Sequence, residues 1–353
     1  MKPTRAQALF LAGAASAVLA IVSISIRMLQ SQAVPPEPPL GFRIIRPPFE
    51  ISALADAGDV ILAGGRDGLF TLDRDGTLLE GAPEDLSFRY IRALIAEKDG
   101  SLWIGHLHGL THRSESGTRH WTEADGLPDP RVNALLREEG DRLWIGTWNG
   151  VCILEDGDLR PWEGTEQLLT PMVKVMFRDS RGGLWFGSTI SPEGGLSLFH
   201  RGEWHRFTMK EGLPHNNVNA VFEDREGVVW VGTGFMDRGG AAAFVFSDGS
   251  WRMERVLTRE DGLAGEKVRS IFQDSNGVYY YGSEYDGVIR DVGDGDSMLL
   301  TEHNGLSSNE VKVFLEDGES VLWLGTKYGL TRIAPEAMPS QPGVTATTED
   351  GQP

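Results

Sequence analysis

Apolar and polar residues alternate in short runs that recur along the chain. In residues 132–138 (VNALLRE) and 218–224 (VNAVFED), apolar side chains occupy every second position. An acidic residue and a glycine turn follow each run, and then comes an apolar stretch such as Leu143-Trp144-Ile145-Gly146. Alternation with a period of two predicts a half-buried β-strand, and the short apolar stretch predicts a buried one.

The apolar stretch occurs in seven copies, and each copy ends on a glycine. Successive glycines are separated by 41, 41, 41, 45, 50 and 43 residues; they are Gly64, Gly105, Gly146, Gly187, Gly232, Gly282 and Gly325. Two further strands, joined by a Gly/Asp hairpin, follow in each unit. Units of this length with four antiparallel strands are typical of propeller blades. The sequence therefore predicts an all-β fold, a seven-bladed β-propeller over residues 41–335.

The last unit is one strand short. Its third strand ends within 329–335, whereas the strand-like segment 41–47 precedes the first complete unit. We expect Phe42–Ile45 to supply the missing outer strand, because this closes the ring and removes an exposed edge.

The N-terminal segment resembles an export or anchoring signal. Lys2 and Arg5 precede an uncharged run of 21 residues, 6–26. This length predicts one hydrophobic helix that spans the membrane, with the propeller outside the cytoplasm. A signal cleaved after Ala33 is the alternative. We assign 1–32 to the anchor or signal, 33–40 to a Pro-rich linker and 336–353 to a disordered tail.

Charge and cysteine content limit the possible partners. The chain carries 33 Lys and Arg against 51 Asp and Glu, a net charge of −18. Such an acidic chain repels phosphate backbones, so we expect no nucleic-acid partner. A single cysteine, Cys152, excludes an internal disulfide and a cysteine-based metal cluster. We expect neither a cofactor nor a metal.

Two segments, 125–151 (DGLPDPRVNALLREEGDRLWIGTWNGV) and 211–233 (EGLPHNNVNAVFEDREGVVWVGT), resemble the two-component regulator propeller repeat. Proteins of that family form the periplasmic sensor half of bacterial hybrid histidine kinases, and several of them recognise oligosaccharides. The resemblance extends over residues 41–335. It implies a seven-bladed sensor propeller in the bacterial cell envelope. No kinase region follows in this sequence, so we expect the propeller to act through a separate membrane or periplasmic signalling protein.

Alignment of the seven first strands reveals a polar position directly after the opening apolar residue. It is occupied by Ser52, Arg92, Asn133, Lys174, Asn219, Arg269 and Lys312. Because first strands line the central channel of a propeller, these residues predict a mostly cationic ring near one mouth. Each cation could pair with a neighbouring carboxylate or carbonyl group. Alternatively, the ring could attract an anionic or carbohydrate ligand.

Acidic residues lie five positions further along the same strands, or four in the shortened first copy. They are Asp56, Glu97, Glu138, Asp179, Asp224, Asp274 and Asp317. Each precedes a turn, where a carboxylate accepts backbone N–H groups, so we interpret them as turn formers rather than metal ligands.

The loops between second and third strands supply further candidate ligand contacts. Trp148 is the one tryptophan of ten outside the repeat register, and the other nine are expected to pack between blades. A longer loop contains Phe235 and Arg238, and equivalent loops contain His106, His108, Tyr285 and Tyr328. Loops on a rigid scaffold commonly carry binding residues.

Three functions fit these patterns. The first is an extracytoplasmic sensor or receptor module for an anionic or carbohydrate ligand. The second is a structural interaction platform in a cell-envelope complex. The third is a lyase or hydrolase acting on a glycan, with His106, His108, Glu284 and Asp286 assembled across blades. No nucleophile elbow, metalloprotease motif or phosphate loop is present in the sequence, so we predict no catalytic residue.

Overall fold

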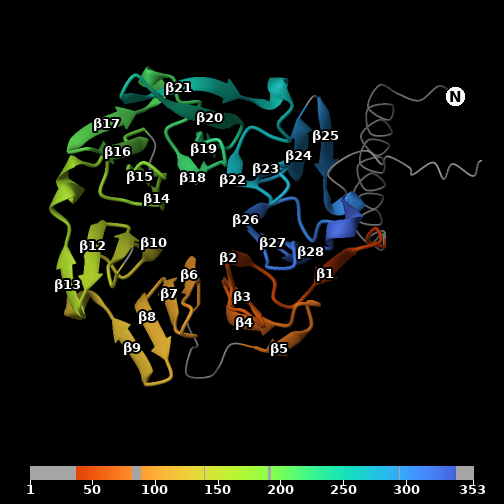
Figure 1. The fold of residues 1–353 in the computed structure, drawn as a ribbon, viewed down its shortest axis with the longest axis horizontal. Coiled ribbons are helices and arrows are strands. Elements are labelled where there is room, and N and C mark those ends of the chain that lie inside the picture. Colours follow the sequence, from red (N-terminus) through yellow and green to blue (C-terminus); the bar gives the residue numbers. More distant parts are fainter. Residues whose placement is uncertain (1–36, 82–88, 139, 190–191, 294, 339–353) are drawn as a thin grey trace, which may run out of the picture. The chain divides into compact units, whose positions relative to one another are not determined.

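The strands of the chain form a ring of seven blades. The computed structural model describes residues 37–338 apart from 82–88, 139, 190–191 and 294. Seven antiparallel sheets of four strands each surround a common centre (Figure 1). The predicted all-β, seven-bladed fold is confirmed.

Blades 1 to 6 each take four consecutive strands. They are β2 (Ile51–Asp56), β3 (Ile61–Gly65), β4 (Gly68–Leu72) and β5 (Leu78–Glu80) in blade 1; β6 (Ala93–Ala96), β7 (Leu102–His106), β8 (Gly109–Ser114) and β9 (Gly117–Trp121) in blade 2; β10 (Val132–Arg137), β11 (Leu143–Thr147), β12 (Gly150–Glu155) and β13 (Asp158–Pro161) in blade 3; β14 (Val175–Arg178), β15 (Leu184–Gly187), β16 (Leu196–His200) and β17 (Glu203–Phe207) in blade 4; β18 (Val218–Glu223), β19 (Val229–Phe235), β20 (Arg238–Ser247) and β21 (Ser250–Leu257) in blade 5; and β22 (Val268–Gln273), β23 (Tyr279–Ser283), β24 (Val288–Gly293) and β25 (Asp296–Leu300) in blade 6.

Blade 7 combines the two ends of the propeller. It contains β26 (Val311–Glu316), β27 (Leu322–Thr326) and β28 (Gly329–Ile333), and β1 (Phe42–Ile45) is its outer strand. β1 runs antiparallel to β28, with Phe42 opposite Ile333 and Ile45 opposite Leu330. The prediction that Phe42–Ile45 closes the ring is confirmed.

The second strand of each blade is sandwiched between neighbouring blades, which explains its uniformly apolar sequence. Every residue of β7, β11 and β27 is buried. The glycine in these strands permits close packing of blades: a Cβ at Gly105 would lie 2.7 Å from Cγ1 of Val132, the opening residue of the next blade. By contrast, all three residues of the outer strand β5 are exposed.

The repeated connector T-x-x-(D/E/N)-G-L forms a capped turn between blades. In the short 3-10 helix Glu123–Asp125, the hydroxyl of Thr122 accepts from a backbone N–H and the carboxylate of Asp125 accepts from the N–H of Thr122. Gly126 follows with a φ of 107°, a conformation that favours glycine. Met209–Glu211 and Arg259–Asp261 repeat this arrangement. The turn directs the chain from the outer strand of one blade to the first strand of the next.

The acidic residues at the ends of first strands stabilise turns, and four of them also hold an aromatic residue. Asp224 Oδ1 accepts the backbone N–H groups of Glu226 and Val228, as expected of a turn former. Its Oδ2 accepts from Trp230 Nε1 at 2.8 Å and from the Tyr279 hydroxyl at 2.7 Å. Equivalent bonds join these pairs: Asp179 to Trp185, Asp274 to Tyr280 and Asp317 to Trp323.

Two blades lack this aromatic bond because glutamate replaces aspartate. Glu138 instead forms ion pairs with Arg142 and Arg178. The buried Nε1 of Trp144, in the same blade, has no hydrogen-bond partner among the described residues. The choice between aspartate and glutamate therefore determines whether the central tryptophan is anchored.

Asp224→Asn should lower the free energy of unfolding by about 2 kcal/mol. An amide can still accept the backbone N–H groups, but its NH2 then faces the donor of Trp230, and a buried unsatisfied donor costs roughly 1–3 kcal/mol. Urea unfolding measures the loss. Asp248→Asn, in an exposed hairpin turn, is the matched control and should change stability by less than about 0.5 kcal/mol. Equal stability of both variants would contradict the anchoring role.

The predicted terminal segments lie largely outside the described residues. These include the N-terminal anchor or signal (1–32) and residues 339–353 of the tail. No helix in the described part of the chain is long and apolar enough to cross a membrane. After β28, the chain continues as a short 3-10 helix, Pro335–Ala337. Ala337 and Met338 pack against the core shared by blades 6 and 7.

Candidate functional site

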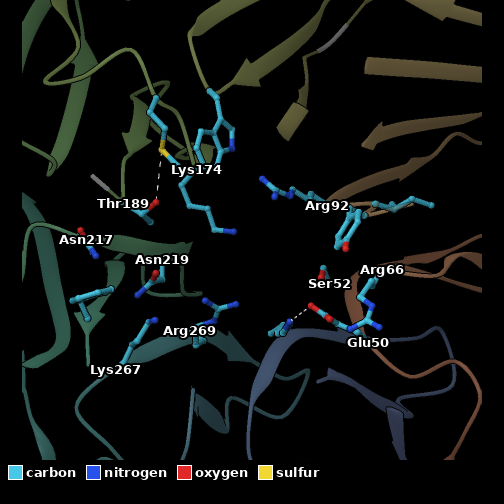
Figure 2. Close-up of a pocket in the computed structure, with 16 residues that line it drawn as sticks. Glu50, Ser52, Arg66, Arg92, Lys174, Thr189, Asn217, Asn219, Lys267 and Arg269 are labelled. Atoms are coloured by element: carbon cyan, nitrogen blue, oxygen red, sulfur yellow. Dashed lines mark hydrogen bonds and ion pairs between the residues drawn. The ribbon is translucent and has the colours of Figure 1, made fainter. Parts of the chain in front are cut away.

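The first strands surround a pocket of about 400 Å³. Figure 2 shows that its side chains come from many blades and point toward a shared space. The polar position of the repeat provides six lining residues, which are Ser52, Arg92, Lys174, Asn219, Arg269 and Lys312. The structure therefore brings the predicted ring together in one pocket, with the exception of Asn133.

In five blades, the residue two positions before the ring position also lines the pocket, and the sequence interpretation missed it. These residues are Glu50, Tyr90, Met172, Asn217 and Lys267. They lie in the segments that lead into the first strands, before β2, β6, β14, β18 and β22 begin. The signal that could have identified them was their fixed spacing of two residues from the ring position.

Loop residues complete the pocket. Arg66, Trp148, Thr189 and Phe235 line it from the connections between second and third strands. Trp148 donates from Nε1 to Asn133 Oδ1 at 3.1 Å, and the Arg131 guanidinium lies 4.3 Å from its ring centre. Phe235 stacks on His215, and the Lys267 amine lies 5.7 Å from the Phe235 ring. Both predicted aromatic residues are held by cationic or aromatic neighbours.

The pocket lining has a large excess of positive charge. Six cationic side chains and one carboxylate, that of Glu50, line it: Arg66, Arg92, Lys174, Lys267, Arg269 and Lys312. The chain as a whole has a net charge of −18. A concentration of cations inside an acidic protein creates a local positive potential that attracts anions.

Carboxylates from the same or a neighbouring blade compensate four of these cations, of which Arg66 pairs with Asp67 at 3.8 Å. Lys312 Nζ lies 2.5 Å from Glu50 Oε1 and 3.6 Å from Glu310. Arg269 contacts Glu284 at 3.4 Å and Glu310 at 3.5 Å, and Lys267 also pairs with Glu284. The pairing expected as the structural alternative therefore exists at Arg269 and Lys312.

Two cations of the ring have no carboxylate partner among the described residues. Arg92 donates to Asn133 Oδ1, and burial together with the charge of Arg131 lowers its pKa, whereas Glu50 opposes this shift. No described group accepts a hydrogen bond from, or forms an ion pair with, Lys174. Burial lowers the pKa of Lys174 to about 7, with further lowering by the nearby cations Arg269, Arg92, Lys312 and Lys267.

The two asparagines of the ring connect successive blades. Asn133 Nδ2 donates to the Val173 carbonyl at 2.7 Å, and Asn219 Nδ2 donates to the Val268 carbonyl at 3.1 Å. Because Val173 and Val268 begin the next blades, these bonds fix the spacing of first strands. Asn133 does not line the pocket, and its bonds to Val173 and Trp148 give it a structural role, while the ligand contact expected from the sequence stays a prediction.

His106 and His108 lie outside the pocket lining. His106 is buried, its Nε2 is 2.9 Å from the Thr111 hydroxyl, and its Nδ1 accepts the backbone N–H of His108. Burial lowers its pKa to about 4, with a smaller contribution from His108 and His120. The equivalent residue Thr147 accepts the same kind of turn N–H, so His106 replaces a turn-capping hydroxyl.

The remaining predicted contacts are exposed residues outside the pocket lining. Arg238, Tyr285 and Tyr328 are exposed on their loops. The Tyr285 hydroxyl donates to Glu284 at 2.9 Å, which already pairs with Lys267 and Arg269. Glu284 is thus engaged by cations rather than assembled with histidines. No group of His, Cys, Asp and Glu side chains suited to a metal occurs in the described part of the chain.

Comparison with solved structures identifies other propellers. The extracellular domain assigned to a hybrid two-component system of B. thetaiotaomicron has a TM-score of 0.71 and 18% identity, covering 85% of this chain and 41% of that one. Virginiamycin B lyase from Staphylococcus aureus has a TM-score of 0.62 and 12% identity (83% and 99% covered). YCF48 from Cyanidioschyzon merolae has a TM-score of 0.63 and 12% identity (84% and 100%).

These likenesses are similarities of fold. The chain spans about two fifths of the length of the first of these proteins. None of the proteins with curated functions matches the sequence. The two-component regulator propeller family matches residues 126–149 and 212–235, in the connectors and first two strands of blades 3 and 5. The resemblance seen in the sequence is confirmed for these two segments, each of which matches the two-component regulator propeller repeat.

Proposed function

We propose that this chain is an extracytoplasmic sensor-type propeller that binds a small anionic ligand in its central pocket and acts through a separate partner protein. The observation that carries the proposal is the surplus of cations in the pocket lining, six against one carboxylate. Structural pairing satisfies Arg269, Lys312 and Lys267, whereas Arg92 and Lys174 have no carboxylate partner among the described residues. An anion bound between them would supply it.

The buried amide of Asn217 adds a second unsatisfied group. Asn217 lines the pocket and is 5% exposed, and its Oδ1 has no hydrogen-bond partner among the described residues. A buried polar atom without a partner costs roughly 1–3 kcal/mol, and this cost is recovered when a ligand supplies the missing bond. A carboxylated or sulfated ligand that also carries a hydroxyl group fits both features. Extracytoplasmic placement is consistent with the family, whose members include extracellular domains.

Thermal unfolding of the purified chain tests the proposal. The ligand panel is simple dianions, acidic and sulfated oligosaccharides, and neutral oligosaccharides of matched length. We expect only the anionic members to raise Tm in a concentration-dependent manner, because a ligand that binds the folded state stabilises it. Arg92→Gln should weaken the binding of an active anion by about 10-fold, equivalent to ~1.4 kcal/mol.

Arg252→Gln provides the matched control. Arg252 is an exposed arginine on the outer strand β21 and pairs with Asp248, so its loss should leave binding unchanged. Equal stabilisation by neutral oligosaccharides, together with normal binding by Arg92→Gln, would contradict an anion site. If no member of the panel shifts Tm, the interaction-platform alternative is favoured over a small-ligand sensor.

A further inference from the structure

Lys174 differs from the other lysines of the pocket because its amine is unpartnered. Lys267 pairs with Glu284, and Lys312 pairs with Glu50 and Glu310. No hydrogen bond or ion pair joins Lys174 Nζ to any described residue. Figure 2 shows the Lys174 side chain extending into the middle of the pocket. The amine is therefore sterically available to a bound molecule.

The groups that face Lys174 are predominantly cations from several blades. Arg92 precedes β6, Lys267 directly precedes β22, Arg269 lies on β22, and Lys312 lies on β26. The other charged groups of the lining are Arg66 and the Glu50 carboxylate, which is bound to Lys312. Burial and these cations lower the pKa of Lys174 to about 7, so a large fraction of the amine is neutral at neutral pH. A neutral lysine beside other cations is an activated nucleophile.

We propose that Lys174 Nζ forms a reversible imine with a small carbonyl compound that also carries a carboxylate, such as an α-keto acid. The inference rests on the proposed function, because the anion site must hold the carboxylate. The nitrogen lone pair attacks the carbonyl carbon and the carbonyl oxygen takes a proton, giving a carbinolamine. Loss of that oxygen as water, with both amine hydrogens, forms the C=N bond. No oxidant or reductant is required.

The surrounding charges select for an anionic carbonyl compound over a neutral aldehyde. Arg92 lacks a described carboxylate partner and can pair with the ligand carboxylate, while Lys174 reacts at the adjacent carbonyl group. The amines of Lys267 and Lys312 are held in ion pairs with Glu284, Glu50 and Glu310, whereas the Lys174 amine has no such partner among the described residues. The pocket therefore contains one unpartnered amine and two paired amines that serve as internal references.

Reductive trapping tests this inference directly. The full-length protein is incubated with pyruvate or glyoxylate and sodium cyanoborohydride, and the modified lysines are located by peptide mass mapping. We expect saturable modification of Lys174, at least ~100-fold faster at pH 7 than that of the exposed residue Lys98, because a pKa of about 7 gives the Lys174 amine a far larger neutral fraction than the reference pKa of lysine would. The rate at Lys174 should rise between pH 6 and pH 8 and then level off.

Two controls separate this activity from simple anion binding. Lys174→Arg keeps the positive charge but should abolish trapping, and acetaldehyde should modify Lys174 much more slowly than glyoxylate. Uniform modification of Lys98, Lys174 and Lys210 would overturn the inference. The inference would also be overturned if Lys174 stayed unmodified at a keto acid concentration that raises Tm to its plateau. In that case the keto acid binds without forming an imine, and the proposed anion site would still stand. Failure of every anion to raise Tm would instead reject the proposed function.

Discussion

Ile45→Asp should lower the free energy of unfolding by about 4 kcal/mol, a large part of the stability of a typical domain. Ile45 is 7% exposed and belongs to the core shared by blades 7 and 1, where it packs with Ile51, Trp323 and Leu330. Aspartate would remove this apolar contact and place a carboxylate at a buried position of the core. Both the lost burial and the desolvated charge oppose folding.

The effect is large because β1 closes the ring. Its pairing with β28 joins residues nearly 290 positions apart, so loss of this strand leaves blade 7 with an open edge. Arg43→Gln is the matched control: Arg43 is exposed on the same strand, and its replacement should cost less than about 1 kcal/mol. Urea unfolding of both variants measures the difference. Similar midpoints would show that the ring closes without the contribution of Ile45.

The fold was predictable because every blade is built from the same pattern of strands and turns. Three features of a blade can be recognised in the sequence: the apolar second strand, the glycine that allows close approach, as Gly105 does for Val132, and the capped turn, as at Thr122. Seven copies of the apolar strand and its glycine predict seven blades. The closing strand β1 was also predictable, because the last unit has only three strands and a complete blade needs a fourth from elsewhere in the chain.

The pocket was predictable only in part, because a repeat shows which positions share a direction but not which residues meet. The ring that includes Arg92 and Lys174 followed from alignment of first strands. Lys267, two residues before Arg269, was missed because it lies just before β22 begins, outside the aligned strand. The ion pair of Lys267 with Glu284 depends on the path of a loop, which no periodicity encodes.

The structure gives His106 a structural role that the sequence interpretation did not consider, and its predicted ligand contact stays a prediction. This position is occupied in other blades by turn-capping hydroxyls such as those of Thr147 and Thr326. The buried ring of His106 caps its turn in the same way. Comparison across blades could have suggested this role, since five of the other six copies carry serine or threonine there.

Lys174→Glu should abolish anion binding, weakening it by at least ~100-fold, while making the folded protein more stable. The reversed charge repels the ligand carboxylate, and a difference of ~2.7 kcal/mol corresponds to this factor. In the absence of ligand, the same change removes an unpartnered amine from among Arg92, Lys267, Arg269 and Lys312 and supplies a carboxylate to them. Functional sites commonly retain unfavourable charge at the expense of stability.

The gain in stability should depend on pH in a specific direction. Because the folded-state pKa of Lys174 lies near 7, well below the value of an unfolded lysine, the unfolded chain binds more protons between about pH 7 and 10. Lys174 therefore makes the wild-type protein less stable at pH 6 than at pH 9.

Urea unfolding should show Lys174→Glu to be more stable than wild type by about 1–2 kcal/mol at pH 6, with a smaller gain at pH 9. Lys98→Glu, at an exposed turn, should show neither the gain nor the loss of binding. A destabilised Lys174→Glu would mean that the amine has a counter-ion in the folded protein, which would remove the basis for both the anion site and the imine.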